Sequence, residues 1–165
     1  MAERRIEHPN RDKAGSKLTR AIVCLLMLAT AGLTLVITAG GWKVLQGAQV
    51  VALFYILLYV GMAFYVLRWN RGVLPVSAGL SILLAVVAAV SAPGWFARDK
   101  PGFIDPSIPA SLLGLLTIIL VPVSILLVAF AVRGMAQKWN VEVEQEVEDD
   151  QDVYGSSRRP EPAGA

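Results

Sequence analysis

Three threonines recur at every fourth position of the first long apolar segment: Thr30, Thr34 and Thr38. In an α-helix this spacing places the side chains on one face, one above another. Hydroxyl groups along such a face can line a path for a polar solute, or they can bond to neighbouring helices. We favour helix packing, because lipid gives helices no hydrophobic reason to associate and their contacts use small and hydroxyl-bearing residues.

A second stripe of small residues follows in the third apolar segment. It consists of Ser77, Ser81, Ala85 and Ala89, and it is widened by Ala78, Ala88 and Ala92. Gly114 lies in the fourth segment, a few residues before Pro122. We predict that both segments pack against other helices through these residues, and that the proline kinks the fourth helix because it lacks a backbone N–H.

Two tyrosines of the second apolar segment, Tyr55 and Tyr59, also share a helical face. A buried tyrosine hydroxyl needs a hydrogen-bond partner. The threonine face of the first segment is the partner that we predict for them.

Groups that carry most enzyme chemistry are scarce in this sequence. It has one histidine, His8, and one cysteine, Cys24. Zinc and haem sites of the usual kinds need more ligands than these, and no Ser–His–Asp or Cys–His arrangement can form in the apolar segments. Those segments also lack the charged residues that mark ion coupling and proton transfer in membranes. We expect no catalytic residues, no cofactor, no metal site and no nucleic-acid partner.

The segments that hold these residues are long enough to cross a membrane. Of the 165 residues, 55% are hydrophobic and 17% are charged, against about 25% charged in globular domains. About 20 apolar residues in a helix span the hydrocarbon core. We predict an all-α membrane protein, a four-transmembrane-helix bundle with short loops and an acidic C-terminal tail. Its spans are 21–40, 48–67, 73–92 and 110–132.

The ends of the chain carry opposite charge. The predicted regions are a basic cytoplasmic arm at 1–20, the transmembrane domain at 21–132 and an acidic cytoplasmic tail at 133–165. The arm has six basic and three acidic residues, and the tail has four basic and eight acidic residues.

The positive charges predict the orientation of the bundle. Ten Lys and Arg residues of the arm, the connection after the second span and the segment after the fourth span lie on one side, and three lie on the other. Because basic residues favour the cytoplasmic side, both termini are predicted to be cytoplasmic in the plasma membrane. A tryptophan follows each span and is predicted to anchor it at the headgroup level. These residues are Trp42, Trp69, Trp95 and Trp139.

The connection Pro93–Pro109 combines aromatic residues with the charged residues Arg98, Asp99, Lys100 and Asp105. Either the aromatic residues press this loop onto the membrane interface, or it is a docking surface for another subunit. The first interpretation is favoured, because aromatic residues are enriched at membrane interfaces in general.

Valine and glutamate alternate at the start of the tail, in Val141, Glu142, Val143 and Glu144. A period of two predicts a strand with valine on one face and acid on the other. Such a strand can pair with the sheet edge of a cytoplasmic partner. A disordered acidic tail that has no partner fits the composition equally well.

Two segments, "WFARDKPGF" at 95–103 and "LLGLLTIILVPVSILLVAFAVRGMAQKWNVEVE" at 112–144, resemble small actinobacterial four-span membrane proteins of unknown function. The resemblance covers residues 20–146. It implies a bacterial plasma membrane, and it brings neither an activity nor functional residues.

Three hypotheses for function remain. The favoured one is a non-catalytic accessory, scaffold or assembly subunit, which contacts membrane lipids and packs against other membrane subunits or copies of itself. The alternative is a small oligomeric transporter or channel for a neutral solute, lined by the threonines with Tyr55 and Tyr59. A membrane enzyme that borrows its chemistry from a partner is the third.

Overall fold

A computed structural model describes residues 4–7 and 9–146 of the chain. Its long helices are α2 (Ala14–Gly40), α3 (Ala48–Leu67), α4 (Val73–Ala97) and α5 (Ala110–Ala136). The shorter elements are β1 (Arg4–Glu7), α1 (Pro9–Asp12) and β2 (Val143–Glu146). All four long helices are apolar and long enough to cross a membrane. The predicted all-α, four-helix membrane bundle is therefore confirmed, and the chain is a multi-pass membrane protein.

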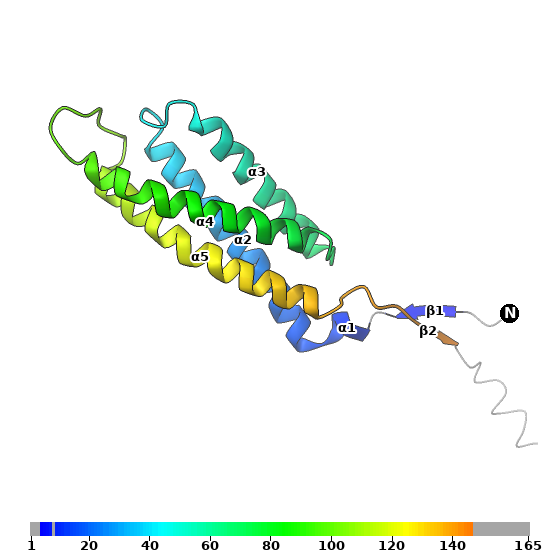
Figure 1. Ribbon diagram of the computed structural model, residues 1–165. Helices are drawn as coiled ribbons and strands as arrows, with labels where there is room; N and C mark the ends of the chain where they lie inside the picture. Colours follow the sequence, from blue (N-terminus) through cyan, green and yellow to red (C-terminus); the bar gives the residue numbers. More distant parts are fainter. Residues whose placement is uncertain (1–3, 8, 147–165) are drawn as a thin grey trace, which may run out of the picture.

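The four long helices run up and down in chain order (Figure 1). Helix α4 packs along α5, and α2 packs against both α3 and α5. The contact between α3 and α4 is the smallest between successive long helices. These two helices converge at the 68–72 connection and separate toward their other ends (Figure 1). We call the end at the 68–72 connection, where α3 and α4 converge, the closed end of the bundle, and the opposite end the open end.

Three of the helices extend beyond the predicted spans. Helix α2 begins at Ala14, because Ser16 and Thr19 of its first turns are buried against the end of the bundle. Helix α4 continues through Pro93 to Ala97, which shortens the predicted loop Pro93–Pro109 to residues 98–109. Proline removes one backbone hydrogen bond of the helix. The burial of Trp95 in the following turn offsets that loss.

The packing face of α4 follows the predicted stripe only in part. Ser77 and Ser81 are buried as expected, but Ala85 is only half-buried and Ala89 is exposed. A helix has 3.6 residues per turn, so a strict spacing of four drifts by about 40° at each step. The buried face continues through Leu84, which was not predicted, and through Ala88 and Ala92, which belong to the widened stripe.

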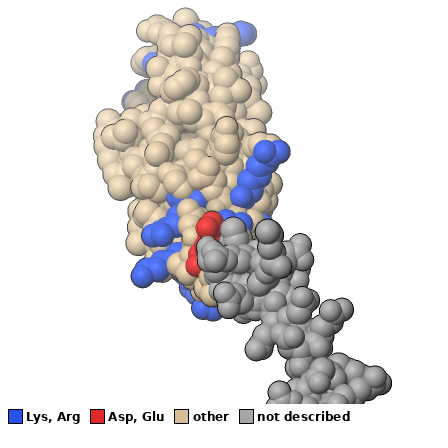
Figure 2. All heavy atoms as spheres, turned by 90° about the vertical axis from the view of Figure 1, so that its right-hand side faces the viewer, with Lys and Arg blue, Asp and Glu red and all other residues tan. Residues whose placement is uncertain are grey.

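Both ends of the described chain lie at the closed end of the bundle. Strands β1 and β2 pair antiparallel there, with Arg4 opposite Glu146 and Glu7 opposite Val143 in the register. Lys and Arg side chains gather around this end of the bundle, and the surface beyond them carries few charged side chains until the opposite end (Figure 2). Many large hydrophobic side chains of the four long helices are exposed. This distribution is the one expected of a bundle that stands across a membrane.

Arginine and tryptophan side chains hold the closed end together. The Arg20 guanidinium lies 4.1 Å from the centre of the Trp69 ring, and its Nη1 donates to the Leu67 carbonyl oxygen at 3.2 Å. The ring of Trp69 meets the buried ring of Trp139 edge to face, with the ring centres 5.5 Å apart. Trp69 has a left-handed backbone (φ 62°), which the hydrogen bond from Asn70 N to Tyr65 O closes as a helix-ending turn.

Candidate functional site

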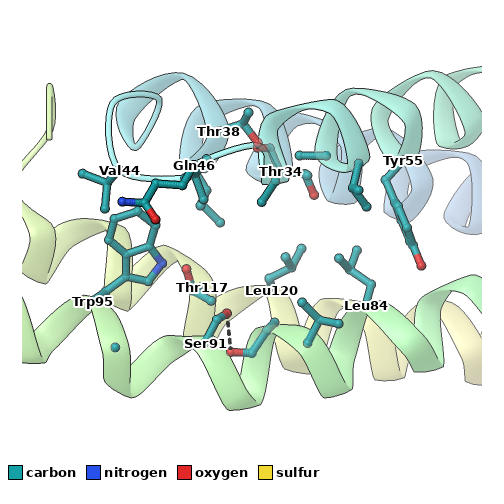
Figure 3. Close-up of a pocket in the computed structure, with 18 of the residues that line it drawn as sticks. Thr34, Thr38, Val44, Gln46, Tyr55, Leu84, Ser91, Trp95, Thr117 and Leu120 are labelled. Atoms are coloured by element: carbon teal, nitrogen blue, oxygen red, sulfur yellow. Dashed lines mark hydrogen bonds between the residues drawn. The ribbon is translucent and has the colours of Figure 1, made fainter.

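A pocket of about 780 Å³ lies in the open half of the bundle (Figure 3). All four long helices and the 41–47 connection contribute to its wall. Most of the lining is aliphatic, and it includes Val51 and Ala52 of α3 and Leu84 and Val87 of α4. Pockets that bind small molecules typically have about 300–1,000 Å³ and an apolar lining with a few polar groups. The pocket is therefore of the size and character of a ligand site.

The pocket opens through the side of the bundle. Val51 of α3 is 59% exposed and Val87 of α4 is 61% exposed, and both line the pocket. In a bundle that spans a membrane, these two apolar rims face hydrocarbon. A ligand can therefore enter from the lipid phase without crossing water.

The threonines divide between the pocket and the protein interior. Thr34 and Thr38 line the pocket together with Thr117 of α5, whereas Thr30 does not. Each hydroxyl of the α2 stripe donates to the carbonyl four residues earlier, at 2.7–2.8 Å. These bonds satisfy the hydroxyl protons and leave the threonine oxygens available only as acceptors.

The two tyrosines have different environments. The Tyr59 hydroxyl lies 3.0 Å from Ser81 Oγ, and both residues are fully buried. The prediction that the threonine face supplies the partner of Tyr59 is therefore wrong, because the threonines bond within their own helix. Tyr55 lines the pocket. Its ring leans on Tyr59, with the ring centres 6.2 Å apart.

Trp95 closes one end of the pocket. It is 6% exposed, and the nitrogen edge of its ring faces the cavity (Figure 3). No hydrogen bond joins its indole N–H to any residue that the structure describes. Gly41 makes room for the ring, since a Cβ at this position would lie 2.5 Å from Trp95 Cη2. The indole nitrogen is accessible from the cavity, so a ligand or a water molecule there can accept its proton.

Arg98 stands between the pocket and a more polar hollow. It lines the apolar pocket and also a hollow of about 540 Å³ formed by the 98–110 segment. Asp99, Lys100 and Asp105 line the same hollow. None of these four charged residues forms an ion pair with another described residue. Arg98 follows Trp95 by one helical turn, so a cation and an unpartnered N–H lie on one side of α4.

The remaining predicted residues lie elsewhere. Gly114 is buried beneath the Phe96 ring, where a Cβ added to the glycine would lie only 2.8 Å from the ring carbons. Of the four tryptophans, Trp42 is 49% exposed, Trp69 is half-buried, and Trp95 and Trp139 are buried within the protein. The last two therefore pack inside the bundle ends, and the anchoring of all four at the headgroup level stays a prediction. The indole N–H of Trp139 donates to Gln137 Oε1 at 3.0 Å.

The predicted contact segment of the tail lies at the closed end. Val141 and Glu142 are exposed, and Val143 and Glu144 belong to β2. The register places Glu144 opposite Ile6 of β1, so this strand pairs with the chain's own arm. The more acidic part of the tail, 147–165, lies outside the described residues.

Within the described part of the chain, no group of His, Cys, Asp and Glu side chains could hold a metal ion. Comparisons with protein-family models, with curated proteins and with solved structures found no match to this chain. The resemblance to four-span actinobacterial proteins therefore stays a prediction.

Proposed function

We propose that this chain is a non-catalytic accessory protein of the plasma membrane, and that its working site is the pocket between α3 and α4. In this proposal the protein holds a membrane-borne ligand that enters through the open side of the bundle. The observation that carries the proposal is the pocket of about 780 Å³, whose exposed rims Val51 and Val87 belong to two helices that separate there.

The chemistry of the lining supports binding and gives no basis for catalysis. Aliphatic residues make up most of the wall, and the hydroxyl protons of Thr34, Thr38 and Thr117 are already bonded within their own helices. The lining contains no histidine, cysteine or carboxylate that could act as a nucleophile or as a general base. A wall of this kind selects for apolar surface and shape.

Two adjacent positions of α4 provide a matched test. Ser91 lines the pocket, and its hydroxyl bonds only to the Ala88 carbonyl oxygen of the same helix, at 3.3 Å (Figure 3). Val90 is 76% exposed and does not line the pocket. We expect Ser91→Phe to fill the pocket, whereas Val90→Phe adds the same bulk on the outer surface.

The measurement is native mass spectrometry of the full chain after purification in a mild detergent. We expect a bound species of small mass on the wild type and on Val90→Phe, and none on Ser91→Phe. A bound species that persists unchanged on Ser91→Phe, with normal thermal unfolding, would contradict the proposal.

The transporter hypothesis keeps one supporting observation, which is the presence of Thr34, Thr38 and Tyr55 in the pocket wall. It would require a path past the buried Tyr59–Ser81 pair below the pocket. Reconstituted vesicles that contain the protein and swell in glycerol would favour transport. Loss of that swelling in Thr38→Val, but not in Thr30→Val, would place the path through the pocket, because only Thr38 lines it.

A further inference from the structure

We infer that the pocket takes a zwitterionic phospholipid, with one acyl chain between α3 and α4, the phosphate at Arg98 and a headgroup ammonium in the hollow beyond it. The inference rests on the proposed function and specifies its ligand. It follows from the order in which apolar, hydrogen-bonding and charged groups succeed one another along α4.

The apolar part of the site matches an acyl chain. Val51, Leu84 and Val87 line the section of the pocket that opens sideways, and two of them form exposed rims. A hydrocarbon chain in this section removes apolar wall from contact with any water at the outer end. The end of the acyl chain can also extend through the side opening into the surrounding lipid, where a water-soluble ligand would not be stable.

The next group along α4 is a hydrogen-bond donor without a partner. Trp95 is buried, its N–H faces the pocket, and no described residue accepts from it. The ester carbonyls of a glycerolipid are acceptors, and they lie between the acyl chains and the phosphate. Such a lipid therefore supplies an acceptor at the level where the protein lacks one.

Arg98 lies one turn further toward the end of α4 and lines both cavities. Guanidinium groups bind phosphate through paired, charge-assisted hydrogen bonds. Its side chain is half-buried and forms no ion pair with a described residue, so its donors are free for a ligand. Tail, ester and phosphate thus meet groups of matching chemistry in the correct order.

The hollow beyond Arg98 decides the charge of the headgroup. It combines the cations Arg98 and Lys100 with the carboxylates Asp99 and Asp105. These charges sum to zero, so a headgroup that carries only its phosphate charge pairs with the cations and leaves the two carboxylates without a partner. A headgroup that pairs its phosphate with an ammonium meets the cations with the one and the carboxylates with the other.

The test measures lipid binding by the purified, delipidated full chain, using native mass spectrometry. The probes are phosphatidylethanolamine, phosphatidylglycerol and diacylglycerol with identical acyl chains. We expect phosphatidylethanolamine to bind best and diacylglycerol to bind worst. Arg98→Gln should weaken phosphatidylethanolamine binding by about tenfold, the size of one charge-assisted contact, and Arg98→Lys should recover part of it. Lys43→Gln is the control, because Lys43 is an exposed cation at the same end that lines neither cavity.

The outcomes separate this inference from the proposed function. Equal binding by wild type and Arg98→Gln, or binding of phosphatidylglycerol as strong as that of phosphatidylethanolamine, would overturn the inference. If Ser91→Phe still abolishes binding in that case, the pocket remains the site and only its ligand has been misassigned. If Ser91→Phe binds all three lipids as the wild type does, the inference and the proposed function both fail. Trp95→Phe keeps an aromatic ring and removes the N–H, and it should weaken binding of both phospholipids alike.

Discussion

The hydroxyl oxygens of Tyr59 and Ser81 lie 3.0 Å apart, and this contact is the one hydrogen bond between side chains of α3 and α4 in the described structure. It forms just below the place where the two helices separate to make the pocket. Both residues are fully buried, so neither hydroxyl has water as an alternative partner. The pair therefore fixes how far the separation of the two helices extends into the bundle.

Removing this hydrogen bond should destabilise the bundle measurably. We expect Tyr59→Phe to lower the free energy of unfolding by about 1 kcal/mol, since hydrogen bonds between membrane helices contribute on average about 0.6 kcal/mol and at most about 1.7. Ser81→Ala should have a similar effect, and the double variant should lose little more than either single one. Tyr65→Phe serves as the control, because Tyr65 is exposed on the same helix. Additive losses measured by unfolding in detergent would argue against the contact.

The outer ends of α4 and α5 meet where Gly114 faces the Phe96 ring. A Cβ at Gly114 would lie 2.8 Å from two carbons of that ring. We expect Gly114→Ala to cost about 1–3 kcal/mol of stability, because overpacking forces the ring or the helix to shift. Gly79→Ala is the matched control, since a Cβ there meets nothing within 4 Å and alanine favours the helix. Equal unfolding temperatures for the two variants would contradict the close contact.

The number of helices and their approximate limits follow from the sequence, because charge-free apolar runs of about 20 residues admit few other structures. The continuation of α4 past Pro93 could not be predicted from the sequence. It depends on the fit of Trp95 beside Gly41, and such a tertiary contact leaves no periodic signal. The partner of Tyr59 differs from the predicted one for the same reason, since hydrogen-bond partners on separate helices depend on how far each helix is rotated about its axis.

The pocket could be predicted only in part. Two of its threonines and Tyr55 stand out in the sequence as polar groups within apolar segments. Trp95 and Arg98 instead fit the pattern of a membrane interface, because tryptophan and arginine are common there. Their spacing of three residues was the available signal, as it places an N–H donor and a cation on one face of a helix. The spacing indicates a shared face only if the helix continues past Trp95, and the structure shows that α4 extends to Ala97, directly before Arg98.

Arg20 joins three segments at the closed end, so its loss should loosen this end specifically. It stacks on Trp69 at 4.1 Å and donates to the Leu67 carbonyl oxygen. We expect Arg20→Gln to cost about 2–4 kcal/mol, the sum of a cation–π contact and a hydrogen bond from a charged group. Lys17→Gln should change stability by less than about 0.5 kcal/mol, because the 3.4 Å ion pair of Lys17 with Asp12 is exposed to solvent. Unfolding followed by tryptophan fluorescence reads both variants, since Trp69 contacts both Arg20 and Trp139. Equal losses in the two variants would contradict the stacking.

The gathering of basic residues at the closed end predicts that this end faces the cytoplasm. Single cysteines test the orientation, because the native Cys24 is buried within α2 and should not react with a water-soluble label. Phe103 is exposed in the 98–109 loop, and Asn140 is exposed after α5. We expect a membrane-impermeant maleimide to label Phe103→Cys in intact cells and to label Asn140→Cys only after lysis, while the wild type stays unlabelled throughout. Labelling of Asn140→Cys in intact cells, with Phe103→Cys protected, would reverse the orientation. It would also move the mouth of the pocket and Arg98 to the cytoplasmic leaflet.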